Sequence, residues 1–346
     1  MICYFQISAK LFQQRISLKI SSRNIITSVN FKPEIFGSIL SINSSKNHQS
    51  PTFFEIIDYK NKLAYILKDN TKFLDGIKEK IHQAPHFKAM TFNAPLEKDS
   101  YHNPTDHNFN TLLGSIALFN LLNIDCYYGN YSQTPVAVEV PSNQIFESLG
   151  HQDNLSEIDQ RKNVIYQPMT YLALINIFSN SLTRTWVKDS ATIVARLKSE
   201  NIYFYHLIKN HKFDLFSRDN NLMIKNHSLI NTIAQEEYLK QYSSDVFYKV
   251  AAENLDREKP CDHEIYQAFE LLKKIANDEK DKHYFTLNNL STQIAIIDNL
   301  KMIHGREGLE RKSQKSLTQA HIPKPSPQTH RHILAVPLRK TTNFLS

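Results

Sequence analysis

The chain has 346 residues, 41% of them hydrophobic and 11% aromatic, and this composition is sufficient for a folded core. Three cysteines are an odd number and too few for a disulfide framework, so we expect a reducing compartment. No apolar run reaches the roughly 18 residues of a membrane span, and we therefore expect a soluble protein without a transmembrane segment.

The net charge of +7 comes from the two ends of the chain. Residues 1–33 and residues 311–346 contain several lysines and arginines and no acidic residue, whereas the residues between them are mildly acidic. A protein surface that binds the phosphate backbone of a nucleic acid needs basic residues clustered within the folded part of the chain. We therefore do not expect nucleic acid as a partner.

Residues 1–150 predict a region of mixed strands and helices. Alternating apolar and polar residues at positions 1–30 favour strands, and the alternative is a targeting sequence, because the segment is N-terminal and free of acidic residues. A hairpin is expected over residues 53–67. The further elements expected are a helix from Asn70 or Thr71 to about His82, a strand over 87–92, a helix over 109–122 capped by Asp106, and strands over 124–128 and 136–140.

After Gly150 the sequence becomes polar, and residues 151–163 are interpreted as a linker. Residues 164–315 then predict a predominantly α-helical region, and residues 316–346, with four prolines among basic and polar residues, predict a disordered basic tail. The fold class expected from the whole chain is α+β. The helices expected in this half cover residues 169–182, 191–198, 228–242, 245–255, 265–276 and 290–303, with one strand over 203–208.

One short segment combines glycine with reactive side chains in a chain that has only seven glycines. It reads His304, Gly305, Arg306, Glu307 and Gly308, and Arg311 follows. One interpretation is a turn whose free N–H groups bind an anion, with Arg306 and Arg311 on the same anion and His304 or Glu307 moving a proton. The other is structural: Gly305 is the left-handed cap of the helix expected over 290–303. We favour the cap and still regard this segment as the first site to test.

Cys126 is a second candidate for chemistry. A thiol nucleophile needs a neighbouring base, and His102 and His107 precede Cys126 in the chain, with Asp106 beside one of them. The structural alternative is a buried cysteine in a strand. Neither a His-Glu-x-x-His sequence nor a paired-cysteine spacing occurs, so we predict no metal site and leave the cofactor unknown.

The composition and the C-terminal tail resemble those of effectors that intracellular bacteria translocate through a Dot/Icm-type secretion system. The chain is poor in glycine and rich in asparagine, lysine and isoleucine, and its tail ends Thr341-Thr342-Asn343-Phe344-Leu345-Ser346, with apolar residues close to the end. The resemblance implies a protein that is cytoplasmic in the producing cell and is then translocated into a host cell, where it acts on host components.

Three functions follow from these observations. The first is an enzyme, a transferase or hydrolase, that acts on a phosphate- or nucleotide-bearing substrate through the segment 304–308. The second is a non-enzymatic module whose helical half binds a host or cellular protein. The third is a cysteine-dependent hydrolase that uses Cys126. The first requires the segment 304–308 to face a pocket shared with residues such as His102 and His107.

Overall fold

The computed structural model describes thirteen segments of the chain, and every structural statement below concerns them. They are residues 25–31, 51–82, 86–93, 104–128, 135–140, 148–153, 169–179, 182–216, 222–240, 242, 260–288, 292–307 and 331–341. None of the described helices is both long and apolar enough to cross a membrane.

A seven-stranded sheet forms one half of the core in the described part of the chain. Only β1 and β2 pair in parallel, and the other neighbours are antiparallel. The order is β1 (Ile26–Asn30), β2 (Ala89–Asn93), β13 (Thr292–Asp298), β6 (Tyr171–Ser179), β15 (Arg331–Lys340) and β3 (Ile124–Cys126), with β4 (Val138–Glu139) also pairing with β15.

A smaller antiparallel sheet of four strands packs against the first. Its order is β12 (His283–Phe285), β7 (Thr185–Asp189), β14 (Met302–Arg306) and β5 (Ser148–His151). Side chains from both sheets, among them Ile297 of β13 and Met302 of β14, share one buried cluster. The tight turn at residues 299–301 connects these two strands and therefore passes the chain from one sheet to the other.

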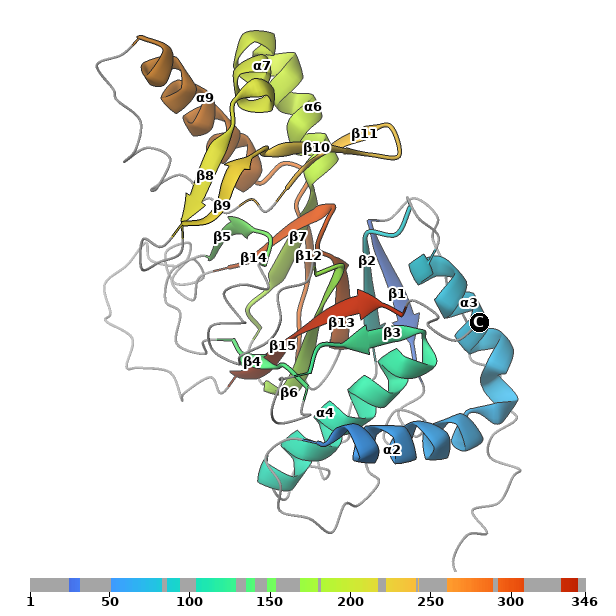
Figure 1. Cartoon of the computed structure of the whole chain (residues 1–346). Coiled ribbons are helices and arrows are strands. Elements are labelled where there is room, and N and C mark those ends of the chain that lie inside the picture. The colour runs from blue at the N-terminus through green and yellow to red at the C-terminus, as the bar shows by residue number, and fades with distance from the viewer. Residues whose placement is uncertain are drawn as a thin grey trace, which may run out of the picture.

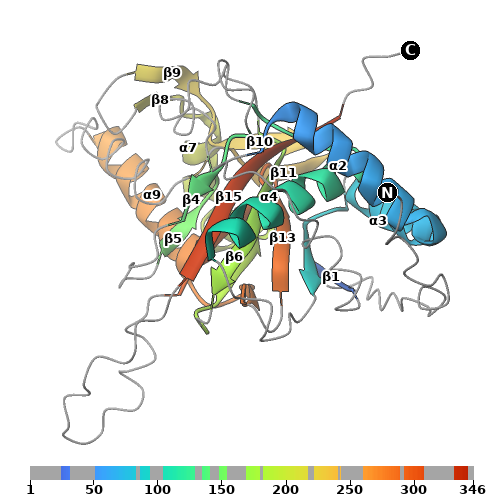
Figure 2. The same cartoon turned by 90° about the horizontal axis from the view of Figure 1, so that it is seen from below.

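Helices cover the outer face of each sheet, which gives four layers (Figure 1). The helices α2 (Phe53–Ile66), α3 (Thr71–His82) and α4 (Pro104–Leu121) pack on the large sheet, and Figure 2 shows α2 and α4 side by side across it. The helices α6 (Ser190–Glu200), α7 (Ile202–Asn210) and α9 (Pro260–Asn277) pack on the small sheet. The remaining elements are a 3₁₀ turn, η2 (Lys68–Asn70), and two hairpins, β8 (Phe213–Phe216) with β9 (Leu222–His227) and β10 (Ile230–Ile233) with β11 (Glu236–Leu239).

Local signals explain where several helices begin. Thr52 and Glu55 form a capping box at the start of α2, in which each side chain accepts a hydrogen bond from the other's backbone N–H. Asp189 caps α6 through the N–H of Ala191, and Asn201 caps α7 through the N–H of Phe204. These side chains satisfy N–H groups that have no partner inside the helix.

The prediction that the C-terminal half is predominantly helical is wrong. The helices expected over 169–182 and 290–303 are the strands β6, β13 and the start of β14, and the helix expected over 228–242 is the β10–β11 hairpin. Every residue of β13 is buried. A strand buried on both faces is a continuous apolar run, which periodicity cannot distinguish from a buried helix.

Three other expectations also fail. Residues 53–67 form the helix α2 and not a hairpin, and residues 203–208 lie in the helix α7 and not in a strand. The tail expected to be disordered contains β15, a ten-residue strand that lies between β6 and β3 in the large sheet. Its prolines and basic residues matched the composition of a disordered segment, although residues 333–338 are largely apolar.

The remaining helices and strands of the first half are confirmed, with boundaries that differ by a few residues. They are α3, β2, α4, β3 and β4, and in the second half α6 and α9. Asp106 lies inside α4 rather than before it, because that helix begins at Pro104. Within residues 1–30, where strands or a targeting sequence were expected, residues 26–30 form the strand β1. Residues 1–24, the helix expected over 245–255 and residues 316–330 lie outside the described part of the chain.

Candidate metal centre

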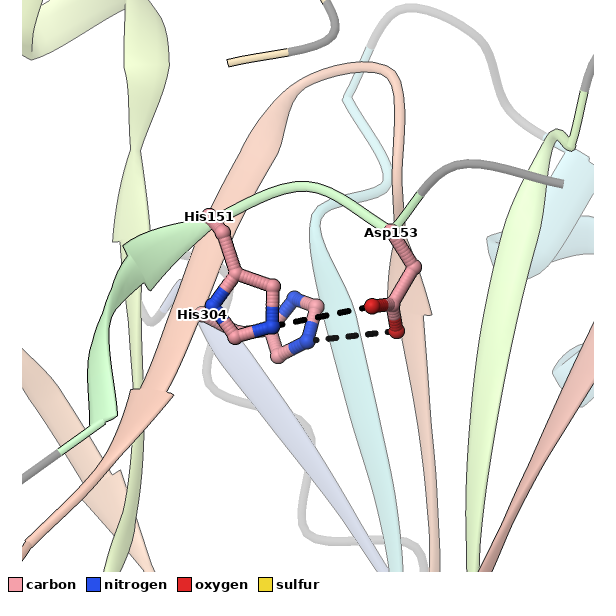
Figure 3. Close-up of side chains that lie close together, drawn as sticks. All are labelled: His151, Asp153 and His304. Carbon is pink, nitrogen blue, oxygen red and sulfur yellow. Dashed lines mark ion pairs between the residues drawn. The ribbon is translucent and has the colours of Figure 1, made fainter. Parts of the chain in front are cut away.

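Two neighbouring strands and the residues just after one of them bring three ligand-type side chains together. His304 of β14 lies opposite His151 of β5 in the small sheet, and their rings are 4.5 Å apart between centroids. Asp153 follows β5, and its carboxylate faces both rings (Figure 3). Its Oδ2 lies 3.4 Å from Nε2 of His304, and its Oδ1 lies 3.6 Å from Nε2 of His151.

Strand alternation explains why His304 faces the space between the two sheets. Met302 belongs to the cluster between the sheets, whereas the next residue, Ile303, packs against the helices outside. Successive side chains of a strand point to opposite faces, so His304 and Arg306 share the inner face with Met302. His151 and Asp153 are also two residues apart, and this spacing brings both side chains to the same side of the chain.

Gly150 allows β5 to lie close to the rest of the small sheet. A Cβ atom at this position would lie 2.7 Å from Cδ1 of Ile303 and 2.8 Å from Cη2 of Trp186, which is too close for non-bonded carbon atoms. Both of these side chains are fully buried. The N–H of Gly150 also donates to Oδ1 of Asn277 at 2.8 Å, which ties the strand to the end of α9. The absence of a side chain at Gly150 therefore helps to place the adjacent His151.

The electrostatics of the site favour an ionised carboxylate. Burial alone raises the pKa of Asp153, but the charge and hydrogen bond of His304 and the charge of His151 outweigh burial and hold the pKa at about 2. The Nδ1 atom of His151 lies 2.8 Å from the backbone oxygen of Leu149, an acceptor that fixes the ring and leaves Nε2 for the site. The Nδ1 atom of His304 is buried without a hydrogen-bond partner among the described residues.

This donor set fits a divalent transition metal. The three ligand atoms all lie within 4.8 Å of one another, as one ion would require. Two histidines and one carboxylate, with the remaining positions open, form the ligand set of non-heme Fe(II) oxygenases. The hydrogen bond from His151 to Leu149 matches the outer-shell contact that usually orients a metal-binding histidine.

The structure separates the residues of the segment 304–308. His304, Gly305 and Arg306 are consecutive residues of β14, which pairs with β7 on one side and β5 on the other. Arg306 is buried, and burial lowers the pKa of its guanidinium. Glu307 follows the strand and forms an ion pair with Arg184.

Residues 304–306 form neither the turn nor the helix cap expected from sequence, because they belong to the strand β14. The backbone of residues 304–306 pairs with β7 and β5, and the N–H of Glu307 donates to the backbone oxygen of Arg184, so the described residues do not form a cluster of free N–H groups. Gly308, Arg311 and His102 lie outside the described residues. The pocket that His102 was expected to share with the segment 304–308 is therefore not described either. His107 lies within α4, and its side chain is outside the described part of the chain.

Cys126 is fully buried in β3, and burial raises the pKa of its thiol to about 12. At pH 8 only about one thiol in ten thousand would be ionised at that pKa, and the thiolate is the reactive form. We expect iodoacetamide at pH 8 to leave Cys126 unmodified in the folded protein and to label it after unfolding in urea. Mass spectrometry of the peptide that contains Cys126 measures this, and rapid labelling of the folded protein would contradict it.

Comparisons with known proteins show the fold. No protein-family model matches the sequence, and no curated protein matches it by sequence. Among solved structures, the non-heme iron oxygenase OrfP in complex with Fe and alpha-ketoglutaric acid matches with a TM-score of 0.56 and 12% identity over 91% of this chain and 94% of that chain. Asparagine oxygenase (AsnO) matches with a TM-score of 0.57 and 10% identity over 90% of this chain and 92% of that chain. The chain therefore has the fold of these non-heme iron oxygenases.

This fold and the cluster at His304 overturn the functions expected from sequence. The structural neighbours are non-heme iron oxygenases, one of them in complex with Fe and alpha-ketoglutaric acid. This finding contradicts all three expected functions: the transferase or hydrolase directed at a phosphate-bearing substrate, the non-enzymatic binding module and the hydrolase based on Cys126. Sequence reasoning selected His304 but missed His151 and Asp153, which fell within the segment interpreted as a linker. The available signal was the spacing His-x-Asp, which becomes informative once residues 302–306 are known to be a strand.

Proposed function

We propose that the protein binds Fe(II) through His151, Asp153 and His304 and is a 2-oxoglutarate-dependent oxygenase. The observation that carries the proposal is the convergence of two histidines and one carboxylate on adjacent strands of a double sheet. Its support from comparison is that the same fold occurs in OrfP, whose structure contains Fe and alpha-ketoglutaric acid, and in AsnO, whose structure contains Fe(II) and succinate.

The side chains of this chain have separate tasks in such a reaction. His151, Asp153 and His304 would hold the metal and leave its other positions open to co-substrate and dioxygen. When bound, Fe(II) supplies the redox chemistry by which dioxygen and 2-oxoglutarate give succinate and carbon dioxide while one oxygen atom enters a C–H bond of the substrate. Asp153 remains ionised near neutral pH because its pKa is about 2, so it needs to lose no proton before metal binds.

The substrate that fits this proposal is a small molecule. The structural neighbours support it, because their complexes contain hydroxylated arginine, canavanine or hydroxyasparagine. Arg306 lies on the inner face of β14 with His304 and is buried. A guanidinium group forms bidentate hydrogen bonds with carboxylates. A carboxylate-bearing co-substrate such as 2-oxoglutarate has the complementary charge.

Two measurements on the full-length protein test the proposal. Under anaerobic conditions, adding Fe(II) and 2-oxoglutarate should produce the visible charge-transfer absorption of a 2-oxo acid chelated to Fe(II). Admitting air should then yield succinate, which chromatography detects, even without a known substrate, because these enzymes consume 2-oxoglutarate slowly on their own. Absence of both the absorption and succinate, in protein shown to be folded by circular dichroism, would exclude the proposed activity.

A further inference from the structure

Two buried amide side chains hold the segment that carries His151 and Asp153. Gln152 lies between these two residues in sequence, and Asn299 lies in the turn between β13 and β14. Both are 5% exposed. Neither is a ligand-type side chain of the cluster, so their hydrogen bonds require a separate explanation.

The side chain of Asn299 forms hydrogen bonds with both the backbone N–H and the backbone oxygen of Asp153. Its Oδ1 accepts from the N–H of Asp153 at 3.0 Å, and its Nδ2 donates to the backbone oxygen of Asp153 at 2.9 Å. One amide thus fixes both peptide groups of the carboxylate residue. The direction of the Cα–Cβ bond follows from those peptide groups, so Asn299 sets where the carboxylate can point.

Hydrogen bonds and an ion pair hold the turn that carries Asn299. The buried carboxylate of Asp298 accepts from the N–H of Leu300 at 3.0 Å and from the N–H of Lys301 at 3.2 Å. It also forms an ion pair with Nζ of Lys301 at 2.9 Å, and both side chains are 6% exposed. The N–H of Asn299 donates to the backbone oxygen of Thr170 at 3.0 Å. β14 begins directly after this turn. The turn therefore positions both Asp153, through Asn299, and His304, through β14.

Gln152 joins the same segment to the helical layer. Its backbone N–H donates to the oxygen of Tyr242 at 2.7 Å, and its Oε1 accepts from the N–H of Tyr242 at 2.9 Å. Its Nε2 lies within donating distance of two backbone oxygens, that of Leu239 at 3.2 Å and that of Leu300 at 3.3 Å. Leu239 and Tyr242 belong to the core formed with α6, α7 and α9. Gln152 therefore connects that core, the turn and the metal ligands.

We propose that Asn299 and Gln152 are positioning residues for the metal, which fix the backbone around Asp153 so that metal affinity depends on two amides that do not contact the ion. The inference rests on the proposed metal site. Outer-shell hydrogen bonds of this kind typically change metal affinity by about 10- to 100-fold. A purely structural role would lower the stability of the fold and leave the affinity of the folded protein unchanged.

The test compares Asn299→Ala and Gln152→Ala with the matched variant Asn201→Ala. Asn201 is also an asparagine whose side chain accepts a backbone N–H, but it caps α7 and belongs to no hydrogen bond of the cluster. Each full-length protein is titrated with Mn(II), and electron paramagnetic resonance measures the free ion. The visible spectrum of the Co(II)-loaded protein reports the geometry of the ligands, and the melting temperature of the metal-free protein reports stability.

We expect Asn299→Ala and Gln152→Ala each to weaken Mn(II) binding at least about tenfold and to alter the Co(II) spectrum. Asn201→Ala should lower the melting temperature and leave both metal readouts as in the wild-type protein. Wild-type affinity and spectrum in both site variants would overturn the inference. If Asn299→Ala does not fold, Gln152→Ala decides by the same criteria. Failure of the wild-type protein to bind Mn(II) or Co(II) is a different result, since it refutes the proposed metal site itself.

Discussion

Replacing Asp153 with alanine should weaken the binding of Fe(II) or Mn(II) more than about 100-fold, and His304→Ala should do the same. Loss of an outer-shell partner already costs about 10- to 100-fold in affinity, and loss of a direct ligand should exceed that range. The metal should also stabilise the folded state much less, because stabilisation by a ligand grows with the logarithm of its concentration divided by the dissociation constant and vanishes when that ratio is small. Anaerobic calorimetric titration gives the affinity, and thermal melts with and without metal give the stabilisation.

His82→Ala is the matched control for these two variants. His82 ends α3, and its Nε2 lies 2.8 Å from the backbone oxygen of Leu122, so the substitution removes a histidine whose hydrogen bond is outside the metal cluster. We expect it to leave the metal affinity unchanged. Metal binding by His304→Ala that matches the wild-type protein would show that His304 is not a ligand.

Replacing Lys188 with alanine should lower the free energy of unfolding by about 3 kcal/mol, because it removes the buried donor of a charge-assisted hydrogen bond to Asp278 and leaves the buried oxygen of Ile275 without that donor. The Lys188 side chain is completely buried, and burial lowers its pKa. Its Nζ donates to the backbone oxygen of Ile275 at 2.6 Å and to Oδ1 of Asp278 at 2.8 Å. These bonds attach the end of α9 to the small sheet, and alanine would leave the oxygen of Ile275 without this donor. Urea unfolding of the metal-free protein measures the change.

Lys62→Ala provides the comparison, because Lys62 pairs with Asp58 at 2.6 Å on the exposed face of α2. Exposed pairs of this type contribute roughly 0 to 1 kcal/mol, so the control should unfold close to the wild-type urea concentration. The argument for Lys188 would be wrong if Lys188→Ala were destabilised no more than Lys62→Ala.

Helices with clear start signals and amphipathic spacing could be predicted from the sequence. The helix ending at His82 has its apolar residues at four-residue spacing, and α9 has them at helical spacing with an acidic first turn. Strands buried on both faces could not be predicted, because β6 and β13 contain uninterrupted apolar runs, at residues 171–175 and 294–297, that show no alternation. Their neighbours in the sheet are distant in sequence, so no local pattern reveals the pairing.

Only part of the candidate site was accessible from the sequence for the same reason. The two glycines near His304 marked it as a candidate, but as part of a turn, whereas residues 304–306 form a strand. His151 and Asp153 became recognisable only when the sheet placed β5 beside β14. The resemblance to translocated effectors remains a prediction. It rests on the composition and the tail, and the fold neither requires nor opposes it.

The place of β15 in the large sheet has a consequence for biosynthesis. β15 lies between β6 and β3 and pairs with both, for example through Leu338 with Tyr171 and with Cys126. While the chain is being translated, β6 and β3 are complete long before β15 leaves the ribosome, and until then the edges that will bind it have no partner. Unpaired strand edges promote aggregation. Nascent chains that stop before residue 331 should therefore require chaperones, and a chain truncated there should not form the large sheet.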